Sequence, residues 1–174
     1  MKKKIVLIGM MGSGKSTVGK ILSKTLKLNF IDTDILIEKK CGLKISEIFD
    51  KYGEKYFRHK EEKIVLNILL NDKKPCVLAL GGGAFLNKKL QKTVLKKTIS
   101  VWLDTNIELI YKRCKKTNKR PLLYESNDKT LKKIIKNLLK IRNPIYSKAK
   151  FIVKTNEQPV GVCNKILIYI KNLI

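Results

Sequence analysis

The sequence predicts an α/β fold in which a parallel sheet of five strands lies between two layers of helices, a three-layer αβα architecture. Five short apolar runs recur along the chain, and longer amphipathic stretches separate them. Strands that alternate with helices form βαβ units, which build parallel sheets. The chain has 174 residues, enough for one compact domain with a sizeable core but cramped for two. We therefore expect a single domain over residues 1–174.

The individual elements follow from these patterns in chain order. The apolar runs predict strands over residues 5–8, 29–31, 76–80, 98–103 and 151–153. The helical patterns cover residues 15–26, 34–41, 54–70, 107–116, 129–148 and 160–172. Thr105 and Glu108 have the spacing of a capping box, so the helix after the fourth strand should begin at a Thr105 cap. Residues 115–128 lack periodicity and are densely charged, which predicts a mobile excursion.

The charge of the chain is strongly unbalanced. Lysine and arginine number 39 against 14 aspartates and glutamates, a formal net charge of +25. Such a surface attracts polyanions, nucleic acid included, without sequence preference. The lysines, however, run from Lys2 to Lys171 with no dominant block and no interleaved aromatic platform. We expect no dedicated nucleic-acid partner, although composition alone leaves a polyanion partner open.

The cysteines and the N-terminal residues indicate in which cellular compartment the protein resides. The four cysteines lie far apart without a C-x-x-C pair, and a single histidine is present, which argues against a structural zinc site. Three lysines at positions 2–4 before an apolar stretch superficially resemble a secretion signal, but the stretch is minimal and Lys15 interrupts it. No run approaches the length of a membrane span. We expect a cytoplasmic protein with reduced thiols and no membrane partner.

The segment from Gly9 to Ser16 matches the phosphate-binding pattern G-x-x-x-x-G-K-[ST]. It follows an apolar strand and opens an amphipathic helix, which is the context that the pattern requires. Glycines let successive backbone N–H groups converge on phosphate oxygens, and the helix N-terminus adds its dipole. Lys15 is placed to reach the β- and γ-phosphates, and the Ser16 hydroxyl to ligate Mg²⁺. The pattern predicts ATP or GTP binding by Gly12, Ser13, Gly14, Lys15, Ser16 and Thr17.

Two carboxylates follow the second predicted strand. Asp32 and Asp34 share a face by alternation, and the carboxyl ends of parallel strands form the edge where ligands bind. One carboxylate could hold Mg²⁺, and the other could accept the proton of a substrate hydroxyl as it attacks the γ-phosphoryl group. The alternative for Asp34 is a helix N-cap, a common role of aspartate.

Six segments together resemble the shikimate kinase family. They are GMMGSGKSTVG, FIDTD, GEKYFRHKE, LGGGAF, KRPLL and IRNPIY, in the family's order and at similar spacings, and they extend from Gly9 to Tyr146. The resemblance implies a phosphate-loop fold like that of nucleoside-monophosphate kinases. It also implies a substrate-binding segment at about residues 33–61 and a mobile lid at about residues 113–126. Leu80 stands where many members carry threonine, and residues 154–158 match the family's adenine-contacting loop only loosely.

The resemblance also implies residue roles. Asp34 matches the residue that binds the ring hydroxyls of shikimate and is the candidate base, and Asp32 matches its partner near the metal. Arg58 and Arg142 match the arginines that grip the shikimate carboxylate, a task that suits the planar guanidinium fork. Gly82 matches a backbone donor to the substrate. Arg120 matches the lid arginine that folds over the phosphates.

Several of these residues have a plainer interpretation. Arg58 has Glu61 and Glu62 within reach on its own helix, a pairing worth only a few tenths of a kcal/mol. Arg142 stands among lysines and would suit solvated surface, unless the following Asn143–Pro144 disrupts the helix and presents the arginine at its edge. The three glycines from Gly81 could form an ordinary loop at a strand end, and Arg120 could be one more exposed charge.

We therefore predict a shikimate kinase that transfers the γ-phosphoryl group of Mg·ATP to the 3-hydroxyl of shikimate. The products are shikimate 3-phosphate and ADP, in chorismate and aromatic amino acid biosynthesis. Lys15, Asp34 and Arg120 are the predicted catalytic residues, Mg²⁺ is the predicted cofactor, held by Ser16 and Asp32, and a monomer is expected. The alternatives are a kinase of gluconate or of a nucleoside monophosphate on the same scaffold, and a phosphate-loop module that binds nucleic acid.

Overall fold

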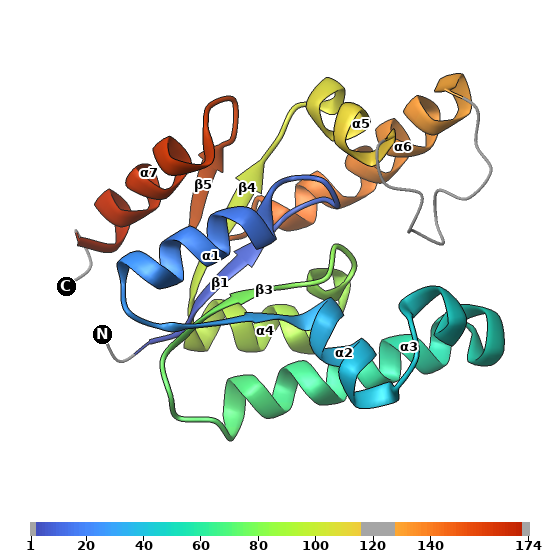
Figure 1. Cartoon of the computed structure of the whole chain (residues 1–174), viewed down its shortest axis with the longest axis horizontal. Coiled ribbons are helices and arrows are strands. Elements are labelled where there is room, and N and C mark those ends of the chain that lie inside the picture. Colours follow the sequence, from blue (N-terminus) through green and yellow to red (C-terminus); the bar gives the residue numbers. More distant parts are fainter. Residues whose placement is uncertain (1–2, 116–127, 172–174) are drawn as a thin grey trace.

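The predicted parallel sheet is confirmed by the structure, a computed structural model that describes residues 3–115 and 128–171. Its five strands are all parallel and lie in the order β2-β3-β1-β4-β5 (Figure 1). Their bounds are β1 (Ile5–Ile8), β2 (Asn29–Asp32), β3 (Cys76–Ala79), β4 (Ile99–Asp104) and β5 (Phe151–Lys154). Each lies within a residue or so of its predicted run.

The register of the strands brings three functional loops to one edge. Ala79, the last residue of β3, lies opposite Leu7 of β1 and opposite Asp32, the last residue of β2. Because the strands run in the same direction, the segments that follow β1, β2 and β3 all emerge at this edge. The phosphate loop, the Asp32–Asp34 segment and the three glycines are therefore neighbours.

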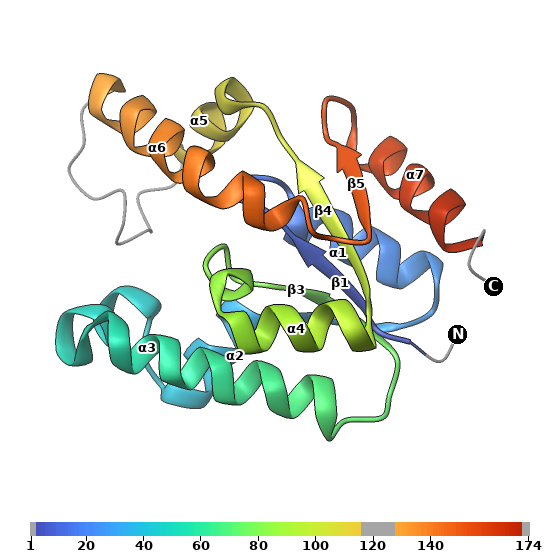
Figure 2. The ribbon, with the colours of Figure 1, turned by 180° about the vertical axis from the view of Figure 1, so that it is seen from behind.

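Helices cover both faces of the sheet (Figures 1 and 2). Ile5 and Leu7 pack with α1 (Lys15–Thr25) and α7 (Pro159–Lys171) on one face. Val6 and Ile8 pack on the other face with α3 (Ile45–Leu70), α4 (Lys88–Lys97) and α6 (Asp128–Tyr146). The remaining described helices are α2 (Thr33–Cys41), the short η1 (Ala84–Leu86) and α5 (Ile107–Lys115). None of the described helices is both long and apolar enough to cross a membrane.

Three helical segments were not predicted: α4, the short η1 and the first part of α3. Helix α4 has only Leu90 and Val94 as buried residues among many lysines, too few to give a clear periodic stripe. A parallel connection from β3 to β4 nevertheless requires a crossover of a dozen or more residues, usually helical, and that requirement could have revealed α4. The first part of α3 covers residues 45–52. Gly53 has the non-helical values φ 77 and ψ 168 and forms a kink between this part and the predicted helix over residues 54–70.

Two predictions about helix ends were wrong, although the bounds of these helices lie close to the predicted ones. The N-terminus of α5 is capped by Asn106, whose Oδ1 accepts from the Leu109 N–H at 2.8 Å. The Thr105 hydroxyl lies 2.6 Å from that of Thr155 instead, so the proposed capping box does not form. Helix α6 continues through Pro144 to Tyr146 and is not disrupted there. Pro144 has no N–H to donate to the carbonyl four residues before it, so the helix loses one bond there but does not end.

Candidate active site

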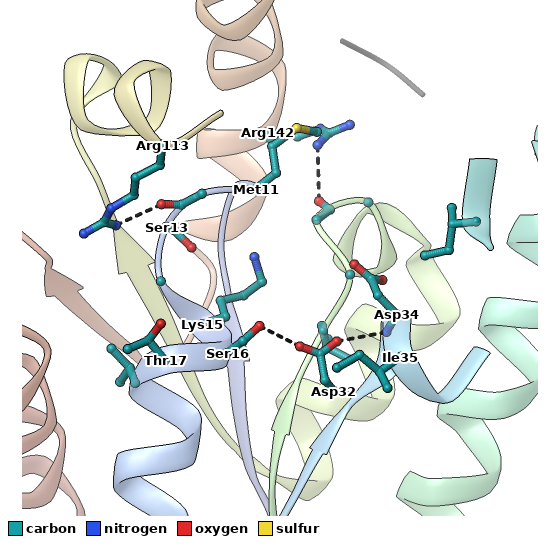
Figure 3. A pocket seen from close by; sticks show the side chains of 18 of the residues that line it. Met11, Ser13, Lys15, Ser16, Thr17, Asp32, Asp34, Ile35, Arg113 and Arg142 are labelled. Carbon is teal, nitrogen blue, oxygen red and sulfur yellow. Dashed lines mark hydrogen bonds between the residues drawn. The ribbon is translucent and has the colours of Figure 1, made fainter. Parts of the chain in front are cut away.

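A cavity of about 540 Å³ opens at the edge of the sheet where the three loops meet (Figure 3). It is lined by all the predicted site residues that fall within the described part of the chain: Gly12, Ser13, Gly14, Lys15, Ser16, Thr17, Asp32, Asp34, Arg58, Gly82 and Arg142. Arg120 and most of the proposed lid lie outside the described residues. The cavity thus unites the phosphate loop with residues that come from four other parts of the chain.

The phosphate loop forms one wall of the cavity. Gly12 and Gly14 adopt φ values of 76 and 93, a left-handed conformation that favours glycine. The loop ends directly at the N-terminus of α1, which begins at Lys15. The Lys15 Nζ lies over the loop and donates to the carbonyls of Gly9 and Met10, at 2.9 Å each. A helix N-terminus and an ammonium group therefore face the same space, an arrangement that favours an anion.

Asp32 joins the second strand to the phosphate loop. Its Oδ1 accepts from the Asp34 N–H at 3.1 Å, so Asp32 is the N-cap of α2. Its Oδ2 accepts from the Ser16 hydroxyl at 2.6 Å, as Figure 3 shows. The capping role considered for Asp34 belongs to Asp32, which leaves the Asp34 side chain directed at the cavity.

The three glycines after β3 give space to charged side chains on the opposite wall. A Cβ at Gly81 would lie 2.6 Å from Asp34 Oδ1 and 2.7 Å from Glu61 Oε1. A Cβ at Gly83 would lie 2.6 to 2.8 Å from three atoms of the Arg58 guanidinium group. These distances are too short for real contacts, so the charged groups pack directly on the glycine backbone. The segment is therefore more than an ordinary loop at a strand end.

Arg58 is already paired within its own helix. It donates to Glu61 Oε2 at 2.7 Å and to Glu54 Oε1 at 3.1 Å. The pairing considered as a plainer interpretation therefore exists, with Glu54 in place of Glu62. Arg58 still lines the cavity, so the pair holds the guanidinium group at the cavity wall.

Glu61 is the buried member of that pair. It is 2% exposed, and its Oε1 has no hydrogen-bond partner among the described residues. Burial raises the pKa of Glu61, and the nearby Asp34 adds to the rise while Arg58 opposes it. The acceptor side of the cavity therefore holds a carboxylate that is costly to keep ionised.

Arg142 reaches the cavity from α6 and is buried, 5% exposed, so solvated surface is the wrong interpretation for it. Its Nη1 lies 3.5 Å from the Gly82 carbonyl oxygen and 3.5 Å from Met10 Sδ. It projects inward from an unbroken helix, not from a disrupted helix end. Arg58 and Arg142 thus present guanidinium groups from different helices to one cavity.

Sequence reasoning missed a third arginine. Arg113 of α5 lines the cavity and donates to the Gly12 carbonyl at 2.9 Å. The signal that could have found it is its position one helix after β4, a strand adjacent to β1. Thr155, Glu157 and Pro159 line the cavity near the end of β5. Thr155 and Glu157 belong to residues 154–158, the stretch in which no residue was assigned, and Pro159 follows it directly.

Comparison with known proteins agrees with this geometry. A family model described as shikimate kinase matches residues 11–171. The chain belongs to the shikimate kinase family. A shikimate kinase of Pasteurella multocida is 40% identical over 174 residues, which cover 99% of this chain and 97% of the relative. One of Zymomonas mobilis is 41% identical over 155 residues, 89% of this chain and 85% of the relative.

Solved structures of the shikimate kinase family share the fold. The structure of shikimate kinase from Acinetobacter baumannii in complex with shikimate has a TM-score of 0.91 at 36% identity, and the match covers 98% of this chain and 93% of that one. The fold of a phosphate-loop small-molecule kinase is therefore confirmed. A gluconokinase from Sinorhizobium meliloti has a TM-score of 0.60 at 15% identity, which shows a shared fold alone.

Proposed function

We propose that the chain is a shikimate kinase, which transfers the γ-phosphoryl group of Mg·ATP to the 3-hydroxyl of shikimate. The products are shikimate 3-phosphate and ADP, in the route to chorismate and the aromatic amino acids. One observation carries this proposal beyond family membership: Arg58, Arg142 and Asp34 line the same cavity as the phosphate loop. Two guanidinium groups suit a carboxylate, and a carboxylate beside them suits a hydroxyl acceptor.

At the nucleotide end, the residues bind and orient the triphosphate. The N–H groups of the loop and of the first turn of α1 surround the phosphates. The Lys15 ammonium, which donates to the Gly9 and Met10 carbonyls, would exchange them for β- and γ-phosphate oxygens. Arg113 supports the Gly12 carbonyl and thereby the shape of the loop. Arg120 is proposed to neutralise phosphate charge from the lid.

The donor set beside the phosphate loop fits Mg²⁺. Ser16 Oγ and Asp32 Oδ2 are hard oxygen ligands 2.6 Å apart, and Mg²⁺ is usually held by one or two protein oxygens plus substrate phosphates. No group of three or more metal-ligating His, Cys, Asp or Glu side chains occurs in the described part of the chain. When bound, Mg²⁺ supplies charge neutralisation at the phosphates.

At the acceptor end, the residues orient the alcohol and receive its proton. Arg58 and Arg142 hold the carboxylate of shikimate, and the Gly82 backbone donates to the substrate. The 3-hydroxyl oxygen forms a bond to the γ-phosphorus while the bond from that phosphorus to the β,γ-bridging oxygen breaks, and Asp34 takes the hydroxyl proton. The leaving electron pair stays on the ADP oxygen. Closure of residues 33–61 and of the lid would exclude water.

We also propose one domain over residues 1–174 that acts as a monomer. A cytoplasmic location is proposed on the ground that the four cysteines are free thiols, the usual state in a reducing compartment.

The rival acceptors differ in charge and shape. A nucleoside monophosphate would bring its phosphate toward Asp34 and Glu61, carboxylates that both pack on Gly81 and would repel it. Gluconate has a carboxylate and hydroxyls and is the closer rival, but the gluconokinase likeness extends to the fold alone.

An ADP-release assay with Mg·ATP tests the proposal. Shikimate, gluconate, AMP and CMP are offered separately at matched concentrations, with a no-acceptor control for ATP hydrolysis. We expect turnover with shikimate alone, and formation of shikimate 3-phosphate by mass spectrometry. Equal or greater turnover with gluconate or a nucleotide would overturn the shikimate assignment.

A further inference from the structure

Tyr146, the last residue of α6, is buried behind the cavity and does not line it. Its exposed fraction is 0%, and its ring centroid lies 6.1 Å from that of Trp102. The hydroxyl at the end of this ring donates to the Gly82 carbonyl. A buried phenol requires a hydrogen-bond partner, and here the partner is the backbone of the glycine assigned to the substrate.

The surrounding bonds hold the glycine segment in one conformation. Gly81 N–H donates to the Thr33 hydroxyl at 2.9 Å, and the Gly81 carbonyl accepts from the Ala84 N–H at 3.1 Å. Tyr146 holds the next carbonyl, that of Gly82. The glycines have no side chains of their own to fix them, so their orientation depends on these bonds. Among these hydrogen bonds, the one from Tyr146 comes from α6.

The same carbonyl is also within reach of Arg142. Its Nη1 lies 3.5 Å from the Gly82 oxygen, one helical turn before Tyr146 on the same face of α6. A carbonyl oxygen that lost the tyrosine hydroxyl would keep, among the described residues, only this long contact from Arg142. The guanidinium group is the nearest replacement, and it would move onto the carbonyl and away from the cavity.

We propose that Tyr146 is a positioning residue for the acceptor. By holding the Gly82 carbonyl, its hydroxyl orients the glycine backbone and leaves the Arg142 guanidinium group available for the carboxylate of the substrate. This inference rests on the proposed function, because it assigns both groups to shikimate. It concerns the acceptor side and leaves the nucleotide side unaffected.

The Tyr146→Phe variant removes the hydroxyl and keeps the ring beside Trp102. We expect the KM for shikimate to rise about tenfold, the cost of losing a hydrogen bond that holds a buried group, with the KM for ATP unchanged. Calorimetric binding of shikimate should weaken by a similar factor. The matched control is Tyr169→Phe, which removes a hydroxyl from a ring stacked on Phe151, away from the cavity, and should change neither KM.

The outcomes separate this inference from the function on which it rests. Absence of shikimate turnover by the unaltered protein would overturn the proposed function itself. With turnover present, an unchanged shikimate KM in Tyr146→Phe would overturn the positioning role. A parallel rise of both KM values together with a lowered Tm would also overturn it, since that pattern indicates general loss of packing.

A second variant covers the case in which Tyr146→Phe does not fold. Burial raises the pKa of Tyr146 to about 12, with a smaller rise from Glu61, while Arg142 and Arg58 oppose the rise. The native phenol therefore remains a donor through mildly alkaline pH. A ring-fluorinated tyrosine at position 146 keeps the shape at neutral pH but has a more acidic phenol. We expect its shikimate affinity to fall, relative to the unaltered protein, as pH rises, because the ionised phenol cannot donate. A constant ratio across pH would contradict the proposal.

Discussion

The two ends of the cavity are built in different ways. The phosphate end comes from one continuous segment, Gly9 to Ser16, whose backbone conformation alone creates the anion site. The acceptor end comes from α2, α3, α6 and the loop after β3, and its two arginines already have partners there: Arg58 pairs with Glu61, and Arg142 lies against the Gly82 carbonyl. Backbone donors carry no net charge, so leaving them without a ligand costs little free energy. Buried charged side chains need partners and space, which Glu61 and the glycines supply.

The difference predicts that a change at the phosphate end acts on turnover most strongly. Lys15→Ala should lower kcat/KM by about a thousandfold or more, since the ammonium neutralises charge that develops on the transferred phosphoryl group. The ADP-release assay measures this effect. The matched control is Lys20→Ala on the exposed face of the same helix, which should leave kcat/KM unchanged. Comparable losses in both variants would mean that general positive charge, and not the site, attracts the nucleotide.

A change at the acceptor end should act on substrate affinity instead. Arg58→Ala should raise the KM for shikimate about a hundredfold, as expected for loss of a charge-assisted carboxylate contact, and should change kcat less. The KM for ATP should be unaffected. Steady-state kinetics with each substrate varied in turn tests this split. An unchanged shikimate KM would show that Arg58 serves Glu61 and Glu54 alone.

Gly83 should be needed to position the Arg58 side chain, but not for folding. Gly83 has φ −98 and ψ −16, which alanine adopts readily. Its Cβ would displace only the far end of the arginine side chain. Gly83→Ala should therefore raise the shikimate KM about tenfold, less than loss of the arginine, with little change in Tm.

A double-mutant cycle gives the sharper test of that contact. In an Arg58→Ala background, Gly83→Ala should have almost no further effect on the shikimate KM, because its target has gone. Additive effects of the two changes would place the role of Gly83 elsewhere. Gly19→Ala offers a contrast, since its Cβ would lie 2.3 Å from the Phe30 ring and should lower Tm.

The phosphate end could be predicted from the sequence more fully than the acceptor end, because it comes from one contiguous segment. The phosphate loop is contiguous, so its residues and their context predicted both conformation and role. The sheet was predicted equally well because its strands are short apolar runs, of which β1, β3 and β4 are almost wholly buried. The Arg58–Glu61 pair could be considered from helical spacing, but its place against Gly83 could not, since that contact depends on how α3 packs beside β3. Tyr146 was part of a recognised segment, yet no local pattern indicates that its hydroxyl reaches Gly82.

The buried carboxylate at the acceptor end should make the stability of the protein depend on pH. Burial raises the pKa of Glu61 above its usual 4.5, so the folded state binds that proton more tightly than the unfolded state. Its contribution to stability is then fully present below the usual pKa and is lost as pH rises through the raised value. Glu61→Gln should remove this loss, so the free energy of unfolding falls less on going from acid to neutral pH. Urea unfolding across that range measures it.

Glu62, the next residue of α3, is the matched control with the opposite sign. Hydrogen bonds from Asn87 and Lys89 lower the pKa of Glu62. Its contribution is present above the usual pKa and is lost as pH falls through the lowered value. Glu62→Gln should therefore weaken the loss of stability on acidification. If Glu61→Gln and Glu62→Gln changed the pH dependence of the free energy of unfolding in the same direction, Glu61 would not be the costly buried carboxylate of the acceptor end.

The smallest effect is expected where the phosphate end depends on a helix cap. Asn106 caps α5, the helix that carries Arg113 to the Gly12 carbonyl. Asn106→Ala should cost about 1 kcal/mol in the free energy of unfolding, the usual value of an N-cap, and raise the KM for ATP slightly. Glu108→Ala should cost under about 0.5 kcal/mol, because its exposed contact is with Lys132 and not with the backbone of a capping box. If Glu108→Ala instead cost more than Asn106→Ala in urea unfolding, Thr105 and Glu108 would form the capping box after all. The helix that carries Arg113 would then begin at Thr105.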